Sequence, residues 1–268
     1  MAQRAERTLG QQRPSGHHRP MRAVLNDMWS VDVDVATHMP NDSAFDVFCE
    51  FEVTDDVDGL GGEIFHLQVT SPSWLEAHAE ENGPRSTRHR VIASTWDANQ
   101  IRGSLAHAVG AIEADNWHRL YREVERIGAG ADMSAIGVAF TDASDALAHA
   151  QPGPGTPALL SITSPEVDIE TWRPFDEAFA VPVHFTVGAT AGDEAEATFS
   201  IVVVSPAWLQ QLAELDGPVV GHGLFVATGW RPDELARSIE LLVADSAGAD
   251  WAEAVDKILT FAVEASQS

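Results

Sequence analysis

The sequence has 268 residues and a formal net charge of −25, with 16 Lys and Arg against 41 Asp and Glu. Such a charge opposes binding to nucleic acid or an anionic membrane and favours a basic protein partner, although solubility or adaptation to high salt explains it equally well. No apolar run approaches the roughly 18 residues that a membrane span needs, and no signal-peptide pattern opens the chain. We therefore expect a soluble, cytoplasmic protein.

Residues 1–20 read as a disordered tail, because they combine Gln, Arg, Pro and Gly without apolar periodicity. The tail can equally be an extension upstream of the true start, since Met21 opens the first strand-like run. His17 and His18 lie side by side in it, but two neighbours lack the three or four converging ligands of a metal site.

The rest of the chain is a tandem duplication. Residues 24–127 and 158–261 are two copies of one module, offset by a constant 134 residues without a gap; Phe65 corresponds to Phe199 and Trp117 to Trp251. Between the copies, residues 128–157 form a linker rich in Gly, Pro and Ala, in which a short helix over 142–150 is expected. The predicted domains are thus copy 1 at 21–127 and copy 2 at 158–268. Both are acidic, with 8 basic against 19 acidic residues in 22–127 and 4 against 17 in 158–261.

Each module begins with three predicted strands. The first covers 24–35 and 159–169; the second, 45–53 and 179–187, alternates apolar and polar residues strictly; the third covers 64–69 and 198–204. Cys49 falls on the apolar face of the second strand, which indicates a buried structural residue rather than a reactive thiol. It cannot form an internal disulfide, because it is the only cysteine.

The sharpest local motif follows, SPSWL at 71–75 and SPAWL at 205–209. Ser71 and Ser205 suit helix N-caps, and the prolines after them suit the first helical position, where a missing N–H costs nothing. A fourth strand is then expected at 90–95 and 224–228, followed by two helices. The second of these helices begins at Trp117 in copy 1 and at Trp251 in copy 2.

The expected order is therefore β-β-β-α-β-α-α in each copy, an α+β fold with helices packed on one face of a sheet. Four tryptophans are expected to be largely buried structural residues, because each lies on the apolar face of a helix: Trp74, Trp117, Trp208 and Trp251.

Positions at which the two copies agree are almost all apolar or turn residues. Among the polar pairs that persist, capping or surface solvation explains Asp34/Asp168, Ser71/Ser205, Glu80/Glu214 and Ser104/Ser238. No His recurs, and neither a phosphate-binding loop nor a paired Cys motif is present. We therefore predict no enzyme activity, no catalytic residue, no metal and no cofactor. A hydrolase active in one copy alone is the weakest alternative.

At this point the residues resemble a family. Gly62-Glu63-Ile64-Phe65 leading to Ser71-Pro72-Ser73-Trp74-Leu75, then a hydrophobic strand and the Trp117 helix, are similar to the immunity protein 8 family of bacterial polymorphic toxin systems. Copy 2 repeats the pattern. The family typically continues with a Trp-Glu-Phe motif, whereas residues 126–128 here are Arg-Ile-Gly and residues 261–264 are Phe-Ala-Val-Glu.

The resemblance implies a non-catalytic α+β protein that binds a cognate toxin, expected to be basic, and blocks it by occlusion. The acidic turns before the third strand are the expected contacts: Asp55, Asp56, Asp58 and Glu63 in copy 1, and Asp193, Glu194 and Glu196 in copy 2. The alternative is that these turns are merely solvated and that the protein is an acidic scaffold or small-ligand-binding protein unrelated to toxins.

Overall fold

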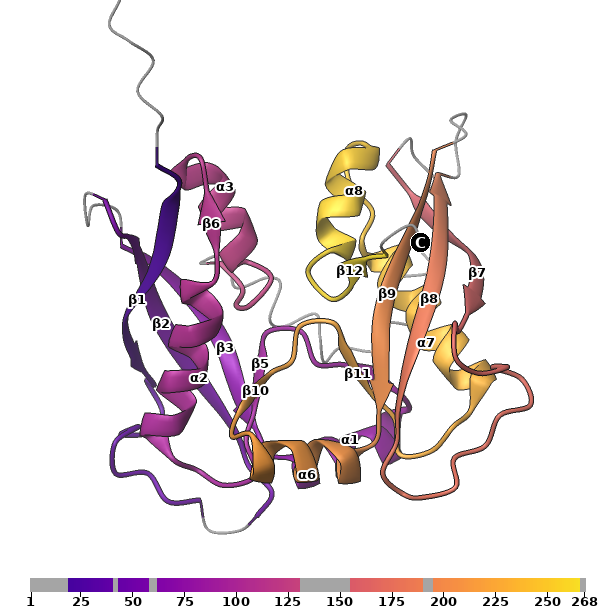
Figure 1. Ribbon diagram of the computed structural model, residues 1–268, viewed down its shortest axis with the longest axis horizontal. Coiled ribbons are helices and arrows are strands. Elements are labelled where there is room, and N and C mark those ends of the chain that lie inside the picture. The colour runs from indigo at the N-terminus through magenta and orange to yellow at the C-terminus, as the bar shows by residue number, and fades with distance from the viewer. Residues whose placement is uncertain (1–18, 41–42, 58–61, 131–154, 190–194, 266–268) are drawn as a thin grey trace, which may run out of the picture.

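The computed structural model describes residues 19–40, 43–57, 62–130, 155–189 and 195–265, and the helix expected over 142–150 lies outside them. Copy 1 contains β1 (Met21–Trp29), β2 (Asp46–Asp55), β3 (Glu63–Thr70), α1 (Pro72–Asn82), β4 (Arg85–Ser86), β5 (Arg90–Ile92), α2 (Ala98–Gly110), β6 (Glu113–Ala114) and α3 (Trp117–Val124). Copy 2 contains β7 (Pro157–Thr163), β8 (Ala180–Ala189), β9 (Glu196–Val204), α6 (Pro206–Leu215), β10 (Val219–Val220), β11 (Leu224–Val226), α7 (Pro232–Asp245), α8 (Trp251–Ile258) and β12 (Val263–Glu264). Figure 1 shows the two copies side by side, each with its own sheet.

The two copies share one strand register. β1–β2–β3 is an antiparallel meander, β5 pairs with β3 in parallel, and β7, β8, β9 and β11 repeat this arrangement. Even the irregularity recurs: the register shifts between Leu25 and Asp27 in β1 and between Leu159 and Ser161 in β7, which are equivalent positions. The α+β fold in two tandem copies is therefore confirmed.

Each copy has its own core on one face of its sheet. In β2 the odd-numbered residues are buried, and they pack against α2 and α3 through Ile101, Leu105 and Leu120. The strict alternation of apolar and polar residues in this strand thus reflects a sheet that is covered on one face only. In copy 2, residues 261–264 stand in place of the Trp-Glu-Phe motif, and the first of them belongs to the copy 2 core. Phe261 is buried and stacks on Phe185, with 6.3 Å between the ring centroids.

The first helix of each copy is capped as expected. Ser71 Oγ accepts from Trp74 N at 3.2 Å and also from Phe45 N at 2.9 Å, so it joins the helix start to the entry of β2. Ser205 repeats both bonds with Trp208 N and Phe179 N. The interpretation of this retained pair as a cap is confirmed.

The copies exchange a strand, which the expected order lacked. β4 leaves copy 1 and pairs with β11 of copy 2, while its equivalent β10 leaves copy 2 and pairs with β5 of copy 1. Around the crossing, Thr87 N donates to Leu224 O at 3.1 Å and Gly221 N donates to Arg90 O at 2.8 Å, equivalent bonds in opposite directions. A Cβ on Gly221 would lie 2.4 Å from Thr87 O, so the two loops touch backbone to backbone.

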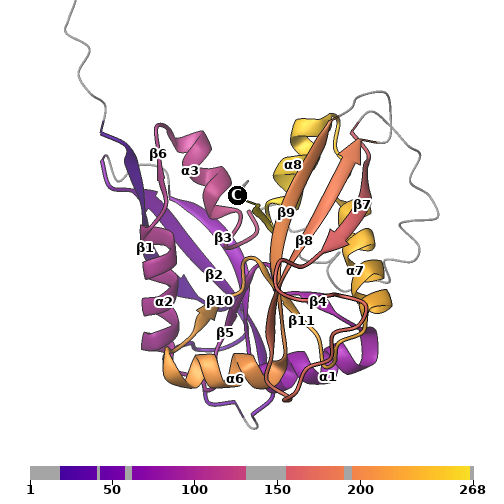
Figure 2. The same cartoon turned by 45° about the vertical axis from the view of Figure 1, so that its right-hand side comes forward.

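The helices α1 and α6 lie beside each other across this junction rather than on the covered sheet faces (Figure 2). A third core fills the junction with residues of both copies, and its buried members include Leu75, Ile92, Leu209 and Val226. Trp74 and Trp208 pack against this shared core, whereas Trp117 and Trp251 pack against the cores of their own copies. All four tryptophans are partly buried, and none is fully enclosed.

The exchange predicts that the two halves remain bound after the linker is cut. A protease site inserted within residues 131–154 should yield two fragments that elute together in native size-exclusion chromatography, because separation would expose the shared core and leave the β4 and β10 pairings unmade. Elution of two separate fragments after complete cleavage would contradict the interlocked arrangement.

Candidate functional site: an acidic end built from both copies

The acidic turns expected to contact a partner are not brought together. The described residues next to these turns, at the end of β2 and at the starts of β3 and β9, lie on opposite sides of the molecule and at the end remote from α1 and α6 (Figure 1). Glu63 and Glu196 are exposed at the starts of β3 and β9. The remaining residues Asp58, Asp193 and Glu194 lie outside the described residues.

The expectation that Asp55 is exposed is wrong. Its residue is only 7% accessible, and Oδ1 accepts from Val57 N at 2.8 Å, so the carboxylate caps its own turn. Asp56 is exposed but engaged: it accepts from Arg22 N at 2.9 Å and pairs with Arg19 at 2.8 Å. These two carboxylates stabilise the base of the hairpin tip.

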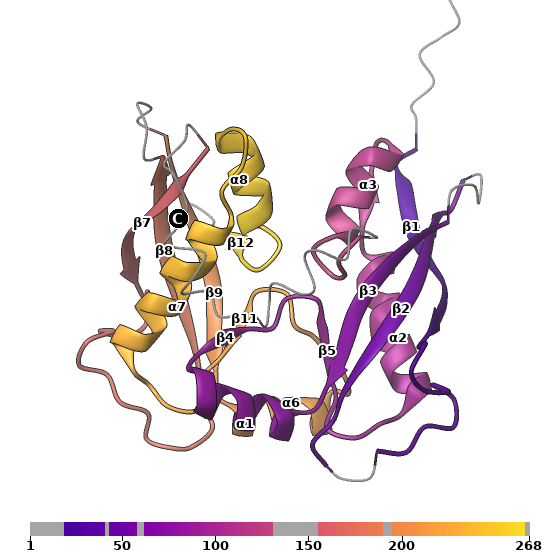
Figure 3. The same cartoon turned by 180° about the vertical axis from the view of Figure 1, so that it is seen from behind.

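The opposite end of the molecule gathers exposed acidic residues from both copies. It is formed by α1, by α6 with Asp216, and by the β1–β2 and β7–β8 loops, which all lie at the same end in every view (Figures 1–3). We call this surface the acidic end and define it by twelve exposed residues: Asp32, Asp34, Glu76, Glu80, Glu81, Glu166, Asp168, Glu170, Asp176, Glu177, Glu214 and Asp216. Within residues 30–40, 72–82, 164–178 and 206–216 the only Lys or Arg is Arg173, so the surface carries a strong negative field.

Strand exchange makes the acidic end a composite of both copies. The helix α1 begins in copy 1, packs against β11 and ends close to α7 of copy 2, where Gly83 lies near Glu234 (Figure 3). The helix α6 runs the opposite way and ends close to Gln100 of copy 1. Each helix therefore carries its acidic residues to the side of the other copy.

The two long loops of the acidic end are held by equivalent tryptophans. Trp96 Nε1 donates to Val35 O at 3.1 Å in copy 1, and Trp230 Nε1 donates to Ile169 O at 2.9 Å in copy 2. Asp34 Oδ1 accepts from Ala36 N and Asp168 Oδ1 accepts from Glu170 N, which confirms the capping role inferred for this retained pair. The tryptophans thus hold the two loop backbones at Val35 and at Ile169.

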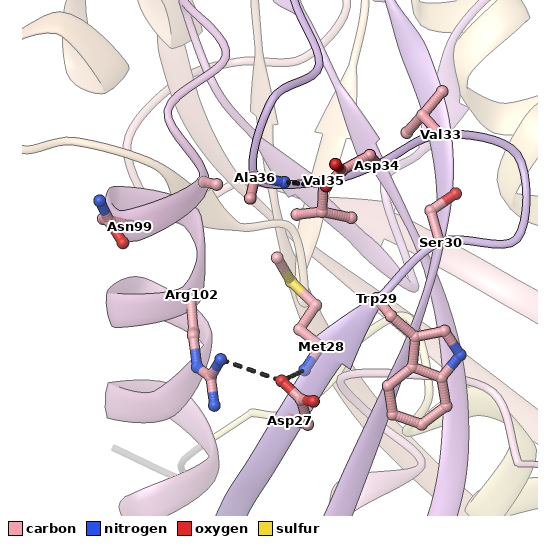
Figure 4. Close-up of a pocket in the computed structure, with 11 residues that line it drawn as sticks. Asp27, Met28, Trp29, Ser30, Val33, Asp34, Val35, Ala36, Asn99 and Arg102 are labelled. Carbon is pink, nitrogen blue, oxygen red and sulfur yellow. Dashed lines mark hydrogen bonds and ion pairs between the residues drawn. The ribbon is translucent and has the colours of Figure 1, made fainter.

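A shallow pocket of about 410 Å³ opens beside the copy 1 loop. Figure 4 shows it between the end of β1, the loop and the start of α2, with Met28 and Val35 among the apolar side chains that line it. Arg102 reaches from α2 to Asp27, with Nη1 to Oδ1 at 2.9 Å, and so neutralises one carboxylate at the edge. The remaining carboxylate at the rim is Asp34, which favours an occupant with a positive charge.

A buried ion pair supports the junction from which α1 extends. Arg90 is 6% accessible, and its Nη1 lies 2.6 Å from Asp46 Oδ1 and 2.6 Å from Thr70 Oγ1. Its guanidinium also lies 4.8 Å from the centre of the Trp74 ring, a cation–π contact. At the positions of Asp46, Thr70 and Arg90, copy 2 has Ala180, Val204 and Leu224. The same position is therefore filled by a charged pair in copy 1 and by apolar side chains in copy 2.

Histidines occupy the crossing loops. His89 has a positive φ of 56° where copy 2 has Gly223, and its Nε2 donates to Glu125 O at 2.9 Å. Burial is the main cause that lowers the pKa of His89 to about 4, and nearby Arg88 lowers it further. Burial likewise lowers the pKa of His222, whose Nε2 donates to Leu259 O at 2.9 Å.

We expect low pH to lower the folding stability of the protein through His89 in the crossing loops. The folded-state pKa of His89 lies below its unfolded value of about 6.5, so the stability that neutral His89 contributes is present above pH 6.5 and lost as pH falls toward 4. The shift corresponds to about 3 kcal/mol over that window. Chemical denaturation at a series of pH values measures it, and His89→Asn, which tolerates positive φ and does not titrate, should flatten the slope. An unchanged slope in that variant would refute the assignment.

Three further features of the described residues concern the Cys49 thiol, metal binding and membrane-spanning helices. Burial raises the pKa of Cys49 to about 12, which keeps the thiol protonated. Among the residues that the structure describes, no group of three or more His, Cys, Asp or Glu could hold a metal ion. Within the same ranges, no helix is both long enough and apolar enough to cross a membrane.

Part of the acidic end can be recognised in the sequence, as polar residues that both copies retain. Glu80/Glu214 and Asp34/Asp168 are polar pairs retained between the copies, and all four residues lie on this surface. Their meeting could not be inferred, because the exchange that carries α1 and α6 across the junction depends on two-residue strands with no pattern of their own.

The comparisons with known proteins agree with the duplication. No curated protein and no solved structure matches the chain. The family model described as immunity protein 8 matches twice, over residues 23–130 and 158–263, and these segments coincide with the two structural copies. The chain therefore belongs to the immunity protein 8 family, of which it carries two tandem copies.

Proposed function

We propose that this protein binds a cognate toxin through the acidic end and neutralises it by occlusion, without a catalytic step. The observation that carries the proposal is the concentration of twelve exposed carboxylates in four segments from both copies, in which the only Lys or Arg is Arg173. Occlusion needs a complementary surface rather than a reactive group, which agrees with the lack of a His or Cys recurring between the copies. Family membership supplies the class of partner, a toxin.

The charge favours a toxin with a basic surface. Long-range attraction between opposite fields raises the rate of encounter, and an inhibitor of an intracellular poison benefits from fast capture. The same field disfavours nucleic acid as a direct ligand. We place the interaction in the cytoplasm of a bacterial cell, where a toxin that enters or is made there would act.

The test is co-expression with the toxin domain encoded beside this gene. Cells that produce the toxin alone should stop growing, and cells that also produce this protein should grow, with a stable complex recovered by co-purification. A protein with the twelve acidic-end carboxylates changed to Asn or Gln serves as the matched control, since its fold does not depend on most of these exposed groups. Growth arrest despite production of the folded wild-type protein would overturn the proposal.

The pocket beside the copy 1 loop favours a second candidate, a small-ligand-binding protein unrelated to toxins. Its rim carries Asp34, so the ligand would be a small cation such as an amine. Calorimetric titration with a polyamine discriminates the two candidates. Saturable binding that Asp34→Asn abolishes, together with failure to rescue growth, would favour the small-ligand function.

A further inference from the structure

The two halves of the acidic end are not equivalent, although the backbone beneath them is. The half built from α1 and the β7–β8 loop carries eight exposed acidic residues, whereas the half built from α6, Asp216 and the described part of the β1–β2 loop carries four. A single partner that approaches the molecule would therefore be drawn more strongly to the β7–β8 side.

One side chain on the β7–β8 side stands entirely in solvent. Phe175 is 103% accessible, the highest value among the exposed large hydrophobic residues of the described chain. Exposure of an aromatic ring of this size is unfavourable in water, by roughly 2 kcal/mol relative to burial. The residues after it are Asp176 and Glu177, both exposed, so the ring is bordered by negative charge.

Contacts on both sides of Phe175 fix the β7–β8 loop while the ring of Phe175 remains in solvent. On one side the ring of Trp172 packs edge-on against Trp230 at 4.8 Å, and on the other Phe179 N donates to Ser205 Oγ at 3.0 Å. Arg173 Nη1 donates to Trp172 O at 2.6 Å, which fastens the backbone just before Phe175. An aromatic ring on a fixed loop loses little conformational entropy when a partner covers it.

Copy 1 does not offer such a ring. The position equivalent to Phe175 is Asn41, and Trp172 is replaced by His38, whose ring packs against Trp96 at 5.0 Å. The most exposed large apolar residue in the described part of the copy 1 loop is instead Met39, at 85% accessible, and Val31 is 69% accessible. The copies thus keep the same scaffold and differ in what they display.

We propose that Phe175 is the aromatic anchor of the toxin interface, and that it inserts into an apolar socket ringed by Lys or Arg on a single toxin molecule. This inference rests on the proposed function and specifies its partner and its geometry. The carboxylates of the β7–β8 loop and α1 meet the basic rim, while Phe175 fills the socket, as aromatic anchors do at the centres of interfaces. One chain then binds one toxin, despite carrying two copies.

The experiment compares Phe175→Ala with the matched variant Met39→Ala in titration against the purified toxin domain, at low and at high salt. Phe175→Ala should weaken binding at least tenfold through faster dissociation at both salt concentrations, and Met39→Ala should leave the Kd within twofold of wild type. The stoichiometry should be one toxin per chain. Both variants should melt at the wild-type temperature, because neither side chain is buried.

The outcomes separate this inference from the function on which it rests. If wild type binds the toxin and Phe175→Ala binds equally well, or if two toxins bind per chain, the anchor is refuted while the immunity function stands. An equal loss in Met39→Ala would also refute it, since it would indicate general apolar contact. If the wild-type protein does not bind the toxin, both the anchor and the proposed function fail.

Discussion

Reversal of three charges at the acidic end, by Glu80→Lys, Asp176→Lys and Glu177→Lys, is expected to lower the association rate with the toxin at least tenfold at low salt. All three residues are exposed and belong to the more acidic half of this surface. Electrostatic attraction between oppositely charged surfaces raises association rates by factors of about 10 to 10³. The three reversals together change the net charge of this surface by six units. The loss should shrink as salt rises and the Debye length falls below about 10 Å.

A matched control for this measurement reverses the same number of charges elsewhere. Glu63→Lys, Glu196→Lys and Glu240→Lys alter the hairpin ends and α7 and give the same net charge, so they test location rather than total charge. We expect a decrease of less than threefold for this variant. If the control variant loses as much rate as the acidic-end variant, or if only the control loses it, the partner binds at the hairpins or responds to net charge alone.

Asp46→Ala is expected to destabilise the protein by about 3–5 kcal/mol, because it leaves Arg90 buried without its carboxylate partner. The side chains of Arg90 and Asp46 are only 7% and 12% accessible, so water cannot replace the lost oxygen easily. The free energy of unfolding from denaturant titration measures the effect. Asp27→Ala removes the exposed partner of Arg102, whose pair is 47% and 60% accessible, and should cost less than about 1 kcal/mol.

Copy 2 supplies a second check on the buried pair. The double variant Asp46→Ala, Arg90→Leu installs the residues that copy 2 carries at equivalent positions. Removing both charges avoids the uncompensated guanidinium, so the double variant should recover most of the stability that the single variant loses. A double variant less stable than Asp46→Ala alone would show that Arg90 stabilises the fold mainly through Trp74 or Thr70.

The sequence predicted what depends on local chemistry and on periodicity. The alternation of Phe45, Val47, Cys49, Phe51 and Val53 located a strand with one buried face, and Ser71 and Ser205 are the caps that the motif predicted. The comparison of two copies in one chain helped, because it separated what the scaffold requires from what each copy displays.

What the sequence could not predict depends on long-range pairing. A two-residue strand such as β4 carries no periodicity, and its partner lies in the other copy, so neither the exchange nor the shared core could be inferred. The charge density of the acidic turns predicts exposed contacts, yet Asp55 is buried in its own turn. Phe175 lay in a segment with no regular element, and only its accessibility in the fold distinguishes it from a core aromatic residue.

Hydrogen–deuterium exchange of the protein with and without the co-encoded toxin domain tests the central claim most directly. We predict that the toxin slows exchange in α1, α6 and residues 164–178 and leaves exchange at the starts of β3 and β9 unchanged. Protection confined to the hairpins at Glu63 and Glu196, with free exchange across the acidic end, would contradict it.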